Sequence, residues 1–215
     1  FFIGKIFKIL NAIFFPILVV SLTFALIISP PDYLQGEAVR IMYVHVPAAW
    51  IALACYSVML ISSLGNYIFK IKNLFIINKS LAPIGLLFTS LAVITGSIWG
   101  RPTWGTWLAL DARLISMLVL MFFYLLFIFI TKFIENESTS NRLSSYTIIL
   151  GSINLPIIKF SVDWWNTLHQ TSSINVIGKV TIDKSMLLPL SLMLLAFLIY
   201  CAMIFLMKFK TEIIK

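Results

Sequence analysis

Long apolar runs separated by short polar stretches dominate the chain. Six of these runs hold the roughly 20 residues that a helix needs to cross about 30 Å of hydrocarbon. They cover residues 10–29, 46–69, 80–98, 114–134, 145–162 and 185–207. The pattern predicts an all-α fold: a polytopic integral membrane protein in which residues 1–215 form a single domain of six transmembrane helices.

Composition agrees with a membrane protein and excludes a soluble domain. The chain is 60% hydrophobic and only 11% charged, with a mean hydropathy of +1.01. Soluble chains are about one-quarter charged. The net charge of +8 lies in short clusters between the apolar runs, which indicates contact with membrane lipid rather than with nucleic acid.

The basic residues also predict an orientation. Of the 16 lysines and arginines, ten fall on the side that holds both termini and six on the other. The positive-inside rule then places both termini in the cytoplasm.

The opposite, outer side carries every tryptophan and both histidines. The tryptophans fall at outer span ends or in outer loops: Trp50, Trp99, Trp104, Trp107, Trp164 and Trp165. The outer loops that we expect to bind a ligand lie around 30–45, 99–113 and 163–184. An ordinary aromatic belt would mark both membrane interfaces. The asymmetry predicts an external binding site.

The most unusual stretch is W-G-R-P-T-W-G-T-W-L-A-L-D-A-R, residues 99–113. Three helix-interrupting residues predict a shaped surface loop here: Gly100, Pro102 and Gly105. A helix from Trp104 onward would place Trp104, Trp107 and Asp111 on one face. Such an aromatic shelf with an acid at its edge suits a planar, mostly apolar ligand.

The only two histidines, His45 and His169, each adjoin a tryptophan-bearing segment at an outer membrane edge. Imidazole is a common metal ligand and an axial ligand of haem iron. Two imidazoles from different outer loops could therefore hold a haem from its two faces. The alternative is that each histidine bonds to backbone or lipid phosphate at the interface.

Charged and polar residues near the site allow structural interpretations as well. Asp111 can stabilise the start of the fourth span while Arg113 reaches lipid phosphates; alternatively, Arg101 or Arg113 pairs with a ligand carboxylate. Pro156 predicts a kink in the fifth span, whose freed carbonyl Asn154 or a neighbouring helix could satisfy.

Several chemistries find no support in the sequence. Cys55 and Cys201 lie inside separate apolar runs, which favours buried thiols over redox or metal chemistry. There is no Walker motif, HExxH motif or hydrolase triad, so we expect no enzyme, and an ATP-driven step would need another subunit.

The 99–113 stretch resembles the tryptophan-rich WWD motif of haem-handling proteins in cytochrome c biogenesis. Together with G-E-A-V-R-I-M-Y-V-H-V-P-A-A-W and I-K-F-S-V-D-W-W-N-T-L-H-Q, it resembles the CcmC (haem exporter protein C) family specifically. This chain has Leu108 and Leu110 where that family usually has tryptophan, so the aromatic shelf is thinner.

The resemblance implies a haem-binding, haem-transport protein with non-covalent b-type haem and the axial ligands His45 and His169. It implies a haem platform made of Trp99, Gly100, Pro102, Trp104, Gly105, Trp107, Asp111 and Arg113. Further contacts with the propionates or around this platform would come from Arg40, Trp50, Arg101, Trp164, Trp165 and Asn166.

The resemblance also implies partners and a location. Haem would be presented at the periplasmic face and delivered to the chaperone CcmE, with CcmD and the transporter subunits CcmA and CcmB as further partners. The location would be the bacterial inner membrane, or the mitochondrial inner membrane.

Three alternatives remain at the sequence level. The first is a haem-translocating subunit of an ABC-type complex, although only the fifth span is notably polar. The second is an integral-membrane oxidoreductase acting on quinone or lipid, for which the sequence offers no redox groups. The third is a purely structural subunit, which the one-sided tryptophans disfavour.

Overall fold

The computed structural model describes residues 2–71, 73–169 and 182–214, and these form helices joined by short connections. The helices are α1 (Phe2–Thr23), α2 (Met42–Phe69), α3 (Asn73–Trp104), α4 (Ala112–Phe133), α5 (Glu137–Gly151), α6 (Asn154–Trp164) and α7 (Lys184–Ile214). A π-helical segment, Phe24–Ile28, prolongs α1, and a 3₁₀ helix, Glu37–Ile41, leads into α2. The all-α prediction is confirmed.

Among the described residues, six helical segments are long and apolar enough to cross a membrane, which confirms the predicted number of spans. They cover Gly4–Ile28, Glu37–Phe69, Asn73–Trp104, Ala112–Phe133, Glu137–Trp164 and Lys184–Ile214. The protein is therefore a multi-pass membrane protein.

The fifth span is not one continuous helix. It breaks at residues 152–153, between α5 and α6. Pro156 lies in the first turn of α6, where its missing N–H leaves no helical bond unmade. The Asn154 amide donates to the Ser116 carbonyl of α4 over 2.7 Å and so ties the start of α6 to its neighbour. The kink was predicted, but it precedes the proline.

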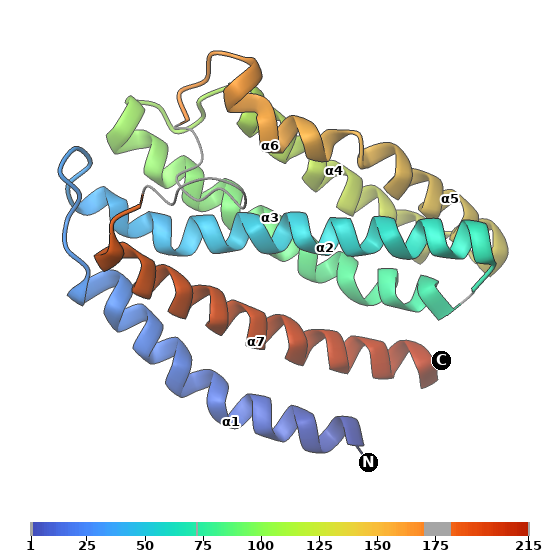
Figure 1. Cartoon of the computed structure of the whole chain (residues 1–215). Helices are drawn as coiled ribbons and strands as arrows, with labels where there is room; N and C mark the ends of the chain where they lie inside the picture. The colour runs from blue at the N-terminus through green and yellow to red at the C-terminus, as the bar shows by residue number, and fades with distance from the viewer. Residues whose placement is uncertain (1, 72, 170–181, 215) are drawn as a thin grey trace.

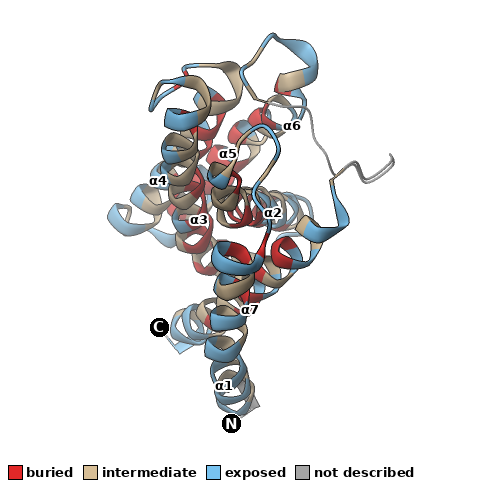
Figure 2. Cartoon of the chain, turned by 90° about the vertical axis from the view of Figure 1, so that its left-hand side faces the viewer, coloured by how far each residue is buried: buried red, intermediate tan, exposed pale blue. Residues whose placement is uncertain are grey.

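The bundle has two different ends (Figure 1). Both termini lie at one end, and the connections α1–α2 and α3–α4 and the residues after α6 lie at the other. Helices α2 and α3 pack side by side, α4 and α5 cover them, and α1 packs mainly on α7. Buried residues gather where α2, α3, α4 and α5 meet, whereas α1 is largely exposed (Figure 2). Cytoplasmic termini remain a prediction.

A closed core fills the bundle between its two ends. Tyr56, Met59 and Tyr124 are fully buried there, and the Tyr124 hydroxyl donates to the Ala52 carbonyl over 2.7 Å. Toward the terminal end, the Asn78 amide donates to the Ser63 hydroxyl over 2.9 Å. Side chains from several helices thus fill the centre of the bundle and the end that holds the termini. The end opposite the termini contains a cavity.

Candidate ligand-binding cavity

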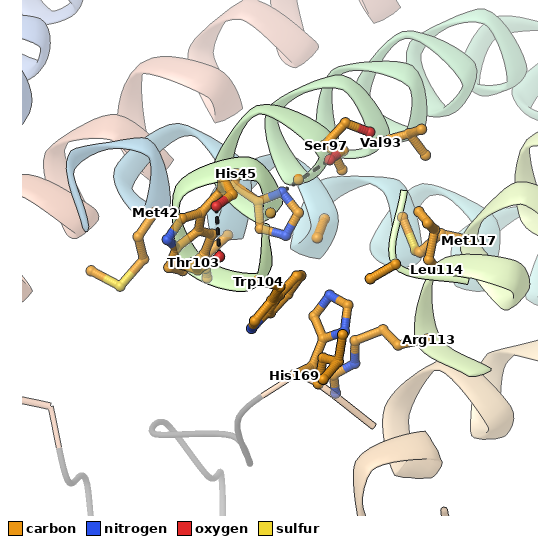
Figure 3. A pocket seen from close by; sticks show the side chains of 18 of the residues that line it. Met42, His45, Val93, Ser97, Thr103, Trp104, Arg113, Leu114, Met117 and His169 are labelled. Carbon is orange, nitrogen blue, oxygen red and sulfur yellow. Dashed lines mark hydrogen bonds between the residues drawn. The ribbon is translucent and has the colours of Figure 1, made fainter. Parts of the chain in front are cut away.

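A cavity of about 550 Å³ lies at the end of the bundle opposite the termini (Figure 1), which we call the cavity end. Figure 3 shows the cavity from close by. Its size falls in the range of about 300–1,000 Å³ typical of cofactor and small-molecule sites. The walls come from the ends of α2, α3, α4, α6 and α7 and are mostly apolar and aromatic. Four tryptophans line it: Trp50, Trp99, Trp104 and Trp107. The cavity brings together segments that are far apart in the sequence.

His45 enters the cavity from the first turns of α2, and not from a loop as predicted. Its Nδ1 lies 2.9 Å from the Ala92 carbonyl oxygen and 3.2 Å from the Thr95 hydroxyl, both on α3. A carbonyl can only accept, so Nδ1 carries the proton and donates it. This leaves His45 Nε2 unprotonated and without a hydrogen bond to any described residue. The ring points toward His169 across the cavity (Figure 3).

Gly96 makes room for the His45 ring. A Cβ atom at Gly96 would lie 2.9 Å from His45 Cε1, closer than side chains normally approach. The His45 ring also meets Trp99 edge-on, with centroids 5.7 Å apart. Sequence reasoning missed Gly96, because a single glycine inside an apolar helix does not reveal which neighbour it faces.

His169 reaches the same cavity from the non-helical residues after α6. Its Nδ1 donates to the Asp111 carboxylate over 2.6 Å, so its Nε2 is also unprotonated, and no described residue hydrogen-bonds to it. The ring lies 4.7 Å from the Trp104 ring, centroid to centroid. A carboxylate behind an imidazole fixes its tautomer and orientation and raises its basicity toward a metal.

Asp111 serves α4 and His169 at once. One carboxylate oxygen accepts from the Leu114 N–H over 2.9 Å and caps α4, as predicted, and the other accepts from His169. Burial acts to raise the pKa of Asp111, but the Leu114 and His169 hydrogen bonds outweigh it and the pKa is lowered. Asp111 is therefore ionised at neutral pH and positions His169 without lining the cavity itself.

His169 is neutral at neutral pH. Burial lowers its pKa below 6.5, and the opposing effect of Asp111 does not restore it. The neutral imidazole is the form that binds metals. Both histidines thus present an unprotonated ring nitrogen to one cavity.

The predicted surface loop at residues 99–113 is wrong for its first part. Helix α3 continues through Gly100 and Pro102 and ends at Trp104. Proline fits helical φ and removes only one backbone bond, and the Thr103 hydroxyl bonds back to the Trp99 carbonyl over 2.7 Å. The turn comes at Gly105, whose φ of +76° favours glycine.

The helical shelf from Trp104 onward is also wrong, because residues 105–110 are not helical. Trp104 sits on the last turn of α3, Trp107 follows in the connection and Asp111 caps α4. Leu108 and Leu110 are 52% and 72% exposed and do not line the cavity. The presence of leucine instead of tryptophan at these two positions therefore does not change the cavity wall.

The residues before α2 close the cavity beside Trp99. The Trp99 indole N–H donates to the Gln35 side-chain carbonyl over 2.8 Å, and Leu34 and Gln35 both line the wall. The Asp32 carboxylate holds this turn by accepting from the Leu34 and Gln35 N–H groups over 2.9 and 2.8 Å. Sequence reasoning missed Gln35, because nothing in the sequence pairs it with a tryptophan 64 positions away.

The predicted site residues divide into two groups. Ten line the cavity or hold a residue that does: His45, His169, Trp50, Trp99, Gly100, Pro102, Trp104, Trp107, Asp111 and Arg113. The others lie elsewhere, namely Arg40, Arg101, Gly105, Trp164, Trp165 and Asn166.

The residues outside the cavity have partners of their own. Arg40 pairs with Glu37, and the Arg101 guanidinium donates to the Gly105 carbonyl. Trp164 stacks on Phe160. Asn166 lines a smaller neighbouring pocket. Of the predicted 163–184 loop, residues 170–181 lie outside the described residues.

The donor set of the cavity suits a metal that brings its own equatorial ligands. The residues described contain no group of three or more His, Cys, Asp or Glu side chains that could hold a bare ion. Two opposed imidazoles between indole rings instead fit a flat metal macrocycle, whose iron needs two axial donors. Neither cysteine lines the cavity.

Comparisons with known proteins also point to a protein that handles haem. Residues 1–215 match the family described as "Heme exporter protein C". The chain is 44% identical to the "Heme exporter protein C" of Bradyrhizobium diazoefficiens, over 87% of this chain and 72% of the relative. It is 37% identical to that of Haemophilus influenzae, over 99% and 86%. A "ccmC-like mitochondrial protein" of Marchantia polymorpha is 43% identical, over 87% and 79%.

Proposed function

The chain belongs to the haem exporter protein C family, a component of haem handling in cytochrome c maturation, and we propose that its cavity holds haem for delivery to the chaperone CcmE. One observation carries the proposal. His45 and His169 line the same cavity, and each donates through Nδ1 and has an Nε2 that no described residue hydrogen-bonds.

In this proposal the protein supplies binding, orientation and shelter, and not catalysis of a bond change. His45 and His169 are the axial ligands, and Trp50, Trp99, Trp104 and Trp107 cover the macrocycle. Haem supplies an iron that accepts two axial nitrogens. The lack of a cysteine in the cavity wall supports non-covalent, b-type haem.

The placement of the cavity supports presentation at the outer face. It lies at the end opposite both termini, and the positive-inside count places the termini in the cytoplasm. We accordingly propose the bacterial inner membrane as the location, with mitochondrial relatives making the equivalent membrane the alternative.

The packed centre of the bundle favours holding over conduction. A haem-translocating subunit of an ABC-type complex would need a path through the region that Tyr56, Met59 and Tyr124 fill. The proposal therefore assigns translocation and ATP hydrolysis to other components, with CcmA, CcmB and CcmD as the partners that the family name suggests.

Haem uptake followed by handover tests the proposal. Purified full-length protein in detergent is titrated with haemin, freed of excess and mixed with purified CcmE. We expect a stoichiometric haem absorption band on the wild type and later covalent haem on CcmE. The double variant H45A/H169A should do neither. Equal uptake by wild type and double variant would contradict holding, and loaded protein that never labels CcmE would contradict delivery.

A further inference from the structure

Two cationic side chains stand on one wall of the cavity. Arg113 comes from the first turn of α4 and Lys159 from α6, and these two helices pack against each other. No aspartate or glutamate is among the described residues that line the cavity. Lys159 was not among the site residues that the sequence predicted.

The acidic groups near this wall lie behind it. The charges of Asp111 and Asp163 act on Arg113, but neither carboxylate lines the cavity, and Asp111 is already engaged by His169 and Leu114. Lys159 makes no ion pair within the described part of the chain. The wall thus turns positive charge toward the cavity and keeps negative charge outside.

Lys159 is not only a lysine that extends toward the membrane surface, because it also lines the cavity. It is exposed and lies on α6, a helix that packs against α4. A ligand in the cavity can therefore pair with the ammonium group without breaking an ion pair to any described residue.

We propose that Arg113 and Lys159 form a subsite for the carboxylate groups of the tetrapyrrole. This inference rests on the proposed function. A guanidinium holds a carboxylate through two parallel hydrogen bonds, and an ammonium acts as a compact point charge. The two cations select macrocycles with free acidic side groups and fix the edge of the ring that faces the α4–α6 wall.

The test compares iron(III) protoporphyrin with its dimethyl ester, in which both carboxylates are blocked. Each compound is titrated into full-length wild type, K159M, K159R and the control K184M, which removes an exposed lysine at the start of α7 that does not line the cavity. Binding and spin state are read from the visible spectrum, and folding from thermal unfolding.

We expect K159M to bind the free acid roughly tenfold more weakly than the wild type, as the loss of one charge-assisted hydrogen bond predicts. K159M and wild type should bind the diester equally, K159R should keep most of the preference for the acid, and K184M should match the wild type. Equal effects of K159M on both compounds, or none on either, would overturn the subsite.

The diester separates this inference from the proposed function. A low-spin diester spectrum in the wild type reports the two histidines independently of any carboxylate contact. If the wild type gives a low-spin spectrum but does not bind the free acid more tightly than the diester, the carboxylate subsite is refuted and the proposed haem site is retained. Without a low-spin spectrum for either compound, the proposed function itself fails.

Discussion

The two histidines occupy the same cavity but are held in different ways. His45 lies in α2, and its Nδ1 bonds to the backbone of α3, which packs along α2. His169 lies in a non-helical segment, and its Nδ1 bonds to the side chain of Asp111. A backbone acceptor inside a helix pair cannot turn away, whereas a carboxylate side chain can. We therefore expect His45 to be the fixed ligand and His169 the exchangeable one.

This difference suits a protein that must both hold and release its cargo. If one axial bond breaks before the other, a partner can approach the freed face while the second ligand still retains the haem.

Haem binding by His45, the fixed ligand, depends most on the space beside its ring. G96V places side-chain atoms where the His45 ring lies and should weaken haem binding by about a hundredfold, the upper end of what disturbed ligand positioning costs. Haem titration followed by absorbance measures the effect. The control is G4V, because a Cβ there meets open space. Wild-type affinity in G96V would show that the position of the ring does not matter.

Haem binding by His169, the exchangeable ligand, depends on Asp111. D111A removes both the cap of α4 and the partner of His169, so haem affinity should fall about 10- to 100-fold and stability by about 1 kcal/mol. N136A removes the N-cap of α5, far from the cavity, and serves as the control. It should lose similar stability and keep its haem affinity. Matching haem affinities in the two variants would refute a positioning role for Asp111.

The pH dependence of haem binding reports on His169, the exchangeable ligand. Protonation of His169 blocks its Nε2, and because burial lowers its pKa below 6.5, affinity should stay level from pH 8 to 6.5 and fall only below that range. Asp111 opposes this lowering, so in D111N the fall should move to lower pH. Titrations at a series of pH values measure the onset, and a fall that begins above pH 6.5 would contradict a neutral His169.

The smallest effect is expected at the wall beside Trp99. Q35A removes the acceptor of the Trp99 indole N–H and should weaken haem binding about fivefold, as the loss of one hydrogen bond of about 1 kcal/mol predicts. The matched control N66A removes the bond from Asn66 to Asn141 near the opposite end, over 2.7 Å, and should leave haem binding unchanged. Equal affinities for Q35A and N66A would remove Gln35 from the site.

The sequence predicted the elements that depend on local signals. Apolar runs long enough to span a membrane identified the six spans, and the asymmetric tryptophans and histidines identified the end with the cavity. The cap on α4 followed from an aspartate just before an apolar run. Each of these features is set by residues close together in the chain.

The details that depend on neighbouring helices could not be predicted. Pro102 looked like a break, but it sits near the end of α3, where the helix tolerates one missing bond. The partners of the two histidines, Ala92 and Asp111, are 47 and 58 positions away. Nothing in the sequence places Lys159 at the cavity, because only the packing of α6 on α4 shows that it lines it.

The visible spectrum of haem-loaded protein, with H45A and H169A measured singly, shows whether the two histidines coordinate the iron. We expect a low-spin wild type, because two imidazoles complete the iron coordination, and conversion to high spin or loss of haem in each variant. H169A should retain more haem than H45A and should regain the low-spin spectrum with added imidazole. A wild-type low-spin spectrum in either variant would show that the two histidines are not the axial pair.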